Sequence, residues 1–188
     1  MCRRIAAGGR QPLARAVGLR RQPAPTVLDA TAGLGRDGYT LAALGARVTL
    51  VERNEIVARL LRDAHRQALE SAGAVAGRIE IVCADAAELM ANAHERAWDV
   101  IYLDPMYPDA GKVALPSKEM QILRDLTGGD ADADRLLAPA RACARRRVVI
   151  KRPLKAPWLA GVEPSASIRS TQIRFDIHLA PAAARCSA

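Results

Sequence analysis

The sequence lacks the closely spaced cysteines and histidines that zinc sites use. Its four cysteines and three histidines are scattered along 188 residues, and none of them forms a CxxC pair. We therefore predict neither a metal site nor the disulfide framework of a small secreted domain. Dispersed thiols are compatible with the reducing conditions of the cytoplasm.

Long apolar runs are also missing. No segment approaches the roughly 20 apolar residues of a membrane-spanning helix, and the N-terminus lacks the apolar centre of a signal peptide. We expect a soluble, cytoplasmic protein without membrane contact. The arginine-rich, acid-free residues 1–28 resemble an organellar transit peptide, but they contain no serine, and Pro12 and Gly18 bracket a short predicted helix.

Aromatic residues are scarce, since the chain has only two Trp, three Tyr and one Phe. Half of the residues are nevertheless apolar, so the core must consist mainly of Ala, Val, Leu and Ile. The length suits one domain with a substantial core. We divide the chain into a basic N-terminal segment (1–25), a main domain (26–180) and a tail (181–188).

The net charge of +8 comes largely from two basic clusters. Such clusters beside a pocket would attract a phosphate backbone, and the alternative is an ordinary solvated surface. The first cluster comprises Arg3, Arg4, Arg10, Arg15, Arg20 and Arg21, and the second comprises Arg141, Arg145, Arg146, Arg147, Lys151, Arg152 and Lys155.

Short apolar runs alternate with helix-like segments from residue 26 onward. This alternation predicts an α/β fold with a doubly wound, mostly parallel sheet of the Rossmann-like type. A short connection between 167–170 and 172–179 leaves no room for a crossover helix, so these two strands should form an antiparallel hairpin. The other predicted strands cover 26–30, 47–52, 79–84, 98–103 and 147–151.

Helical spacing of apolar residues predicts several helices between the strands. One begins behind Asn54, which is a plausible N-cap, and another covers 37–44. Two more are expected over 118–126 and 134–144, with Pro139 as a kink or a late start of the second.

A glycine-rich loop, DATAGLGRDG, follows the first predicted strand and opens the first helix. Gly33, Gly35 and Gly38 spell GxGxxG, and Glu52 ends the next strand near the spacing at which an acid binds a ribose, so an NAD-dependent oxidoreductase is one candidate. Asp29 favours S-adenosylmethionine instead, because a carboxylate there would meet a cationic amino acid moiety and repel a pyrophosphate.

Acids stand at or just after the ends of four predicted strands. Because ligands bind at the carboxyl ends of such strands, these acids should share one rim of the sheet. Solvated acids at strand ends are the alternative explanation. The four acids are Asp29, Glu52, Asp85 and Asp104.

Asp104-Pro105-Met106-Tyr107 closes the fourth predicted strand with an acid, a proline and an aromatic ring. Proline cannot continue a strand, so carbonyls beside it can accept hydrogen bonds together with the acid, while Tyr107 stacks on a ring. Such a loop can hold a planar amine, which a dehydrogenase does not need. An ordinary Asp-Pro turn is the alternative.

Together, DATAGLGRDG, LVERN, IYLDPMYP, SKEM, VVIKRP and RFDI, in this order, resemble the RsmJ (YhiQ) family. The resemblance covers about residues 9–179, and Met106 replaces the second proline of the wider class I methyltransferase motif, as it does in this family. It implies 16S rRNA (guanine(1516)-N(2))-methyltransferase activity, with S-adenosyl-L-methionine as cofactor and small-subunit ribosomal RNA, or the assembling small subunit, as partner.

The resemblance also implies site residues. Asp104, Pro105 and Tyr107 would hold the guanine amine and base, and Asp104 would also touch the cofactor. Glu52 would take the ribose, and Asp85 or its neighbour the adenine, although the family has a serine pair in place of Asp85-Ala86. The remaining cofactor contacts would be Asp29, Gly33, Gly35, Arg36, Asp37 and Arg53, and the basic residues facing RNA would be Lys112, Lys118, Lys151 and Arg152.

The family generally carries a longer N-terminal region than this chain, so the basic segment 1–25 is expected to be truncated. If the additional region helps to hold RNA, the chain would bind cofactor but methylate poorly. Methyl transfer to adenine N6 or to a protein glutamine, and an RNA-binding module without catalysis, remain alternatives to guanine N2.

Overall fold

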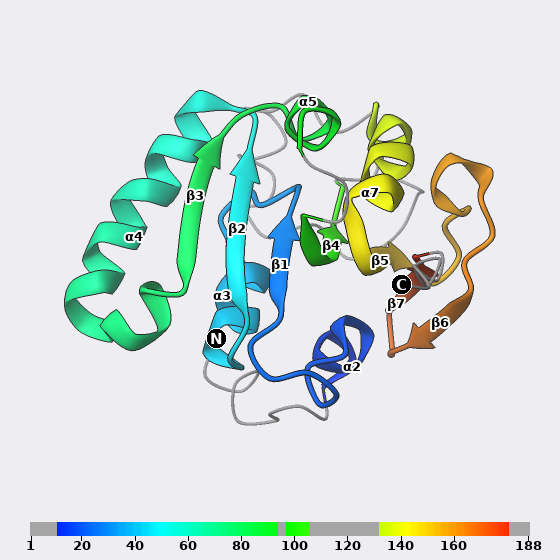
Figure 1. Ribbon diagram of the computed structural model, residues 1–188, viewed down its shortest axis with the longest axis horizontal. Helices are drawn as coiled ribbons and strands as arrows, with labels where there is room; N and C mark the ends of the chain where they lie inside the picture. The colour runs from blue at the N-terminus through cyan, green and yellow to red at the C-terminus, as the bar shows by residue number, and fades with distance from the viewer. Residues whose placement is uncertain (1–10, 94–96, 106–131, 181–188) are drawn as a thin grey trace, which may run out of the picture.

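The computed structural model describes residues 11–93, 97–105 and 132–180 and contains one seven-stranded sheet (Figure 1). Its strand order is β3-β2-β1-β4-β5-β7-β6. The strands are β1 (Thr26–Asp29), β2 (Arg47–Glu52), β3 (Ile79–Cys83), β4 (Trp98–Leu103), β5 (Ala144–Pro153), β6 (Ala166–Arg169) and β7 (Ile173–Leu179).

The first five strands run parallel, whereas β7 pairs antiparallel with both β5 and β6. The predicted mostly parallel sheet with an antiparallel C-terminal hairpin is thus confirmed. β5 extends beyond the predicted 147–151 at both ends, because Ala144 pairs with Trp98 of β4 at one end and β7 pairs with β5 as far as Pro153 at the other.

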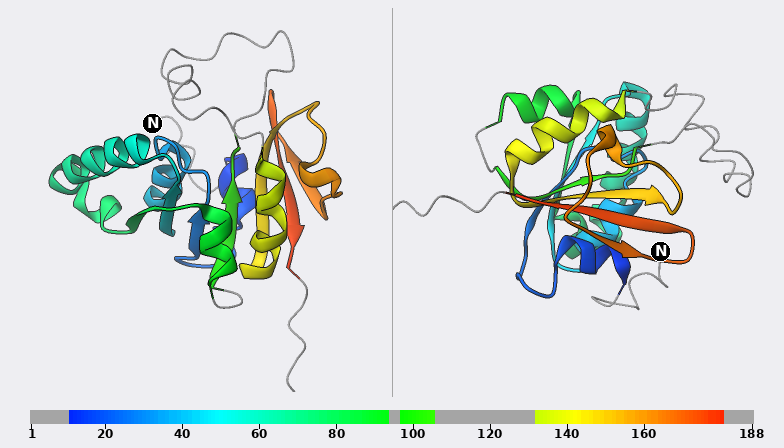
Figure 2. Two further views of the ribbon diagram at one scale, coloured as in Figure 1. Left: turned by 90° about the horizontal axis from the view of Figure 1, so that it is seen from above. Right: turned by 90° about the vertical axis from the view of Figure 1, so that its right-hand side faces the viewer.

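Helices cover both faces of the sheet. Apart from the short 3-10 turns η2 (Ala133–Leu136) and η3 (Leu159–Gly161), they are α2 (Pro12–Val17), α3 (Arg36–Ala43), α4 (Glu55–Ala76), α5 (Ala86–Ala91) and α7 (Leu137–Cys143). α5 and α7 lie on the face opposite to α2 (Figure 2).

Most helix predictions agree with the structure. The Asn54 side chain accepts hydrogen bonds from the amides of Ile56 at 3.0 Å and Val57 at 3.2 Å, which confirms the predicted cap of α4. The segment 134–144 starts late, as a 3-10 turn that becomes helical at Leu137. Helix α5 was not predicted, and the helix expected over 118–126 lies outside the described residues.

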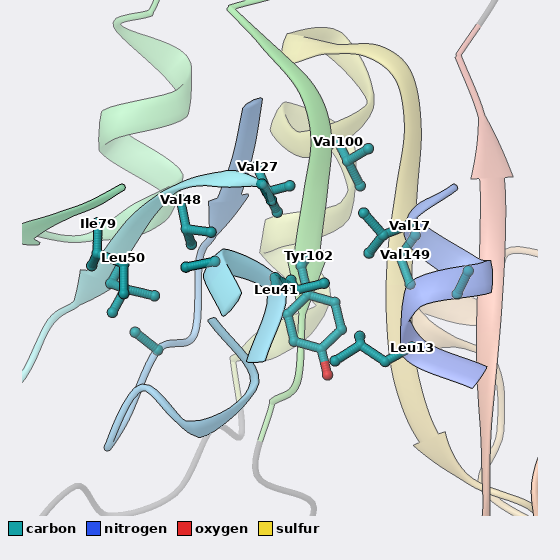
Figure 3. Close-up of a cluster of buried hydrophobic side chains, with 14 of the residues drawn as sticks. Leu13, Val17, Val27, Leu41, Val48, Leu50, Ile79, Val100, Tyr102 and Val149 are labelled. Atoms are coloured by element: carbon teal, nitrogen blue, oxygen red, sulfur yellow. The ribbon is translucent and has the colours of Figure 1, made fainter. Parts of the chain in front are cut away.

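The hydrophobic core lies on both faces of the central strands. Val27 belongs to one cluster with Leu13, Leu41 and Tyr102 from α2, α3 and β4 (Figure 3), whereas its neighbour Leu28 belongs to a second cluster with α5 and α7. All of these side chains are buried, as expected for strands covered on both sides. α2, within the N-terminal segment 1–25, therefore packs into the same core as the sheet.

The described part of the chain lacks two kinds of feature. None of its helices combines the length and apolar character needed to cross a membrane. No group of three or more His, Cys, Asp or Glu side chains in these residues could hold a metal ion.

Candidate functional site

A pocket of about 710 Å³ lies at the carboxyl ends of β1, β2, β3 and β4. This is the rim on which the four strand-end acids were expected, and all four line the pocket. Of the predicted cofactor contacts, Gly35 alone is absent from the lining, which includes Asp29, Gly33, Arg36, Asp37, Glu52, Arg53, Asp85, Ala86 and Asp104.

The glycine-rich loop folds tightly between β1 and α3. Gly33 and Gly35 have φ angles of 52° and 73°, in the left-handed region that glycine adopts without strain. A Cβ on Gly35 would lie 2.8 Å from Leu61 Cδ1, so a side chain is also sterically excluded there. The loop thereby exposes backbone to the pocket, where Gly33 is part of the wall.

Glu52 secures this loop from the end of β2. Its Oε2 accepts a hydrogen bond from the Gly33 amide at 2.9 Å, and its Oε1 accepts one from the Asn54 amide at 2.8 Å. The carboxylate is only 8% exposed, and its orientation is therefore set by two backbone donors. Carboxylate oxygens have further lone pairs, which ligand hydroxyls could use.

Arg53, Asp132, Arg135 and Asp85 form a chain of ion pairs along the other side of the pocket. Arg53 Nη1 lies 2.9 Å from Asp132 Oδ1, and Arg135 contacts both Asp132 and Asp85. Burial acts to raise the pKa of Asp85, but the bond from Arg135 and the α5 amides of Glu88 and Ala87 lower it. Asp85 therefore stays ionised as the N-cap of α5.

A second chain of charges lies at the base of the pocket. Lys151 Nζ is 2.9 Å from Asp37 Oδ2 and 2.6 Å from Asp104 Oδ2. The Tyr102 hydroxyl donates to Asp37 Oδ2 at 2.6 Å. Burial acts to lower the pKa of Lys151, but Asp104 and Asp37 outweigh it and raise the pKa, so the lysine remains a cation between two acids.

Asp29 is the most deeply buried acid of the pocket, with an exposure of 2%. Burial, with the nearby carboxylates of Asp37 and Asp104, raises its pKa to about 8, although the Thr31 amide and Lys151 act in the opposite direction. Asp29 is thus mostly protonated at neutral pH. A ligand that brings a positive charge to it would favour the ionised form.

Asp104 stands directly after β4 and is tied to the glycine-rich loop. Its amide donates to Thr31 Oγ1 at 2.6 Å, and Pro105 behind it is buried. The predicted substrate acid and the β1 loop are therefore joined by a hydrogen bond. Met106, Tyr107, Lys112 and Lys118 lie outside the described residues.

The two remaining basic residues predicted to face RNA lie elsewhere than expected. Lys151 is part of the pocket, paired with Asp37 and Asp104. Arg152 is 1% exposed and donates to the Pro157 carbonyl oxygen at 2.5 Å through Nη2. Such burial does not fit an RNA contact, and we do not retain that role for Arg152.

Sequence reasoning missed Tyr102, Asp132 and Arg135 as members of the site. Tyr102 contacts Asp37 from 65 residues away, and Arg135 contacts Asp85 from 50 residues away. No local motif marks such pairs, since they depend on strand order. The sequence could have predicted only the pair of Asp132 and Arg135. These residues are three apart, and residues with this spacing are neighbours on a helix surface.

Gly38 offers a test of how closely α3 must approach the sheet. A Cβ there would lie 2.2 Å from Cδ2 of the fully buried Leu50 and 3.3 Å from Asp29 Oδ2. We expect Gly38→Ala to reduce the free energy of unfolding by about 1–3 kcal/mol, measured by urea denaturation. Gly73→Ala is the control, because no atom lies within 4 Å of its Cβ position and stability should not fall. Equal stability of the two variants would contradict the expectation.

Comparisons with known proteins point to one class of enzyme. The family described as "Putative SAM-dependent methyltransferase" matches residues 1–180. Ribosomal RNA small subunit methyltransferase J of Shewanella loihica is 48% identical over 181 residues, which cover 94% of this chain and 70% of the relative.

Solved structures give the same picture. The crystal structure of a SAM-dependent methyltransferase from Neisseria gonorrhoeae is 37% identical, with a TM-score of 0.74, over 96% of this chain and 73% of that one. A 16S rRNA N2 G1207 methyltransferase of T. thermophilus, in complex with AdoMet and guanosine, has a TM-score of 0.63 over 90% of this chain and 42% of its own. At 20% identity, this second likeness shows the fold alone.

Proposed function

Because this chain belongs to the SAM-dependent methyltransferase family that includes ribosomal RNA small subunit methyltransferase J, we propose that it methylates the N2 amine of a guanine in small-subunit ribosomal RNA. One observation carries the proposal beyond the family. Asp104 follows β4 at the rim of the same pocket that Asp29 and Glu52 line, so a substrate amine held by Asp104 would lie next to a cofactor. Such a substrate implies action in the cytoplasm.

The residues around the pocket fit S-adenosylmethionine. Asp29 would receive its cationic amino group, because a positive charge stabilises the ionised form of this buried acid. Glu52 would accept from the ribose hydroxyls, and Asp85 and Ala86 would border the adenine. The backbone of Gly33, together with Arg36, Asp37 and Arg53, would complete the enclosure, and Gly35 would shape the loop from behind the pocket wall.

The protein's own contribution to the reaction is mainly orientation. When bound, S-adenosylmethionine supplies an activated methyl group. Guanine N2 is a weak nucleophile, since its lone pair is delocalised into the ring. Hydrogen bonds from its N–H groups to Asp104 and the Pro105 carbonyl would fix its direction and stabilise the positive charge that develops on nitrogen. Tyr107 would stack on the base, a contact worth about 1–3 kcal/mol.

Lys151 and Thr31 would prepare Asp104 for this role. The Lys151 ammonium holds one carboxylate oxygen, and the Thr31 hydroxyl holds the backbone amide. Burial and the carboxylates of Asp104 and Asp37 raise the pKa of Tyr102 well above its ordinary value, so its hydroxyl remains a donor to Asp37. The acid that would meet the amine is thus held by Thr31 in the loop after β1 and by Lys151 of β5, and Tyr102 of β4 acts on it only through Asp37, the second carboxylate partner of Lys151.

Methylation of small-subunit RNA, followed by nucleoside mass spectrometry, tests the proposed function. Free RNA and isolated small subunits would each be incubated with isotopically labelled S-adenosylmethionine. We expect labelled N2-methylguanosine in at least one of the two. Label in N6-methyladenosine would overturn the choice of base, and label in neither RNA would overturn the choice of substrate.

Cofactor binding is expected to strengthen as the pH rises from about 6 to 8. With its pKa near 8, Asp29 must lose a proton before it can pair with the cofactor's amino group. Binding at pH 7 should therefore release protons, and affinity should increase by at most about tenfold per pH unit. Calorimetry with S-adenosylhomocysteine, in buffers of different ionisation enthalpy, measures both quantities.

Asp29→Asn is the matched control for this pH dependence. The asparagine keeps the shape of the side chain but cannot ionise, so its weaker binding should vary little over the same range. A similar pH dependence in Asp29→Asn and in the unchanged protein would show that another group is responsible.

A further inference from the structure

Basic side chains gather at the rim of the sheet opposite to the pocket. Three of them lie at the amino ends of parallel strands, which point down in Figure 1. Arg47 is the first residue of β2, Arg78 precedes β3, and Arg21 lies in the segment that leads to β1. Arg145 and Arg146 lie near the start of β5. All five residues are exposed, and we call them the basic rim.

Hydrogen bonds connect the segments that carry the basic rim. The Val48 amide donates to the Arg78 carbonyl at 2.8 Å, and the Arg47 amide donates to the Pro25 carbonyl at 2.9 Å. The Arg146 side chain donates to Gln22 Oε1, which connects the start of β5 to the segment before β1. Five cations from four parts of the sequence are thus held along one edge.

A shallow groove of about 600 Å³ lies within this edge. Arg47 and Arg78 line it on one side, and the partly exposed ring of Trp98 belongs to its wall. Arginine and an aromatic ring are the two groups with which proteins hold single-stranded RNA, through phosphates and bases respectively.

Few acids compensate the charge of the basic rim among the described residues. Glu80 lines the groove, and Asp99, which accepts hydrogen bonds from the amide and hydroxyl of Thr26, is also close enough to Arg145 to interact with its charge. Burial and the neighbouring charges of Arg146 and Arg21 lower the pKa of Arg147, so like charges crowd here. An anion that bound at this edge would relieve this repulsion.

The opposite rim has the reverse balance of charge. The lining of the 710 Å³ pocket includes six acids and four basic residues, and the basic ones are Arg36, Arg53, Arg135 and Lys151. Arg53, Arg135 and Lys151 each pair with a carboxylate. An RNA backbone is therefore attracted more strongly to the basic rim than to the lining of the pocket.

We propose that the basic rim binds backbone phosphates of the substrate RNA, at a segment distinct from the base that enters the pocket. The inference rests on the proposed function only for the identity of the RNA. β2 has six residues, so at about 3.3 Å per residue the two rims are separated by roughly 20 Å. A single folded RNA can reach both rims, whereas a nucleoside or a very short oligonucleotide cannot.

The double variant Arg21→Gln, Arg47→Gln tests this surface. With a small-subunit RNA fragment in about 0.1 M salt, we expect Kd to rise about tenfold and the slope of log K against log salt to fall in magnitude by about 1.4. KM for methylation of that fragment should rise with little change in kcat. Affinity for S-adenosylhomocysteine should stay the same, because neither arginine lines the cofactor pocket.

Arg59→Gln, Arg62→Gln is the matched control, since both residues are exposed on α4 and the change in charge is identical. An equal loss of RNA affinity in the two double variants would overturn the proposal, because net charge alone would then explain it. The proposal would also be overturned if Arg21→Gln, Arg47→Gln lost as much affinity for a short oligonucleotide that contains the target base as for the RNA fragment, because the short oligonucleotide cannot reach both rims. Absence of methylation by the unchanged protein would refute the proposed function, while the RNA affinities would still decide whether the basic rim binds RNA.

Discussion

Asp104→Ala should lower the rate of methyl transfer by about 10²–10³-fold while cofactor affinity changes much less. Loss of one preorganised polar group at a centre where charge develops typically costs this much. Asp104 lies at the rim of the pocket, whereas Glu52 and Asp29, which are proposed to hold the cofactor, are unchanged. Single-turnover methylation of small-subunit RNA measures the rate, and calorimetry with S-adenosylhomocysteine measures the affinity.

Asp104→Asn separates the acceptor role from the charge. The amide keeps one carbonyl oxygen, but it loses the ion pair with Lys151, so we expect a rate between those of the alanine variant and the unchanged protein. Turnover of Asp104→Ala within a few-fold of the unchanged protein would contradict the proposed role of this acid.

Lys151→Met is expected to impair both stability and activity. The ammonium lies between Asp37 and Asp104, and Asp29 is close enough for its pKa to respond to all three. Removing the cation takes the neutralising charge from the buried Asp37 and the partly exposed Asp104, which should reduce the free energy of unfolding by about 3 kcal/mol. Methyl transfer should fall as well, because Asp104 would lose the group that orients it.

Urea denaturation and single-turnover kinetics measure these two effects of Lys151→Met. Lys155→Met is the control, since Lys155 is exposed four residues further along the chain. Lys151→Arg keeps the charge and should recover much of the stability. If Lys151→Met proved as stable as Lys155→Met, the lysine would not be neutralising the buried acids.

Much of the fold follows from local patterns in the sequence. Short apolar runs predict the strands, and apolar residues at helical spacing predict most of the helices. The two patterns of apolar residues can be told apart in the sequence. Asn54 predicts the start of α4, and the short connection before Gln172 predicts the antiparallel hairpin. Helix α5 escapes prediction because its six residues are too few to show a period.

The candidate site is predictable only where its residues stand at strand ends. Asp29, Glu52, Asp85 and Asp104 share a rim because the carboxyl ends of parallel strands meet. The partners of Lys151 are 114 and 47 residues away in sequence, so their contacts depend on the order of the strands. A local pattern carries no information about that order.

Arg152, near the end of β5, was predicted to face RNA but is buried. Arg174 donates to the carbonyl oxygens of Pro153, Leu154 and Ala156, and Arg152 donates to that of Pro157. These two side chains supply donors to the carbonyls of this turn, of which that of Pro153 also accepts from the Ala156 amide. In the sequence, such an arginine looks the same as one that meets a phosphate.

The hydrogen bond between Thr31 and Asp104 joins the two halves of the pocket, and binding in one half is therefore expected to affect binding in the other. The Thr31 side chain belongs to the loop that would border the cofactor, and the amide that it receives belongs to the acid that would meet the amine. We expect a ligand that orders one segment to favour ordering of the other, because this bond joins them. A cofactor that raises the affinity for RNA must then gain affinity from RNA by the same factor.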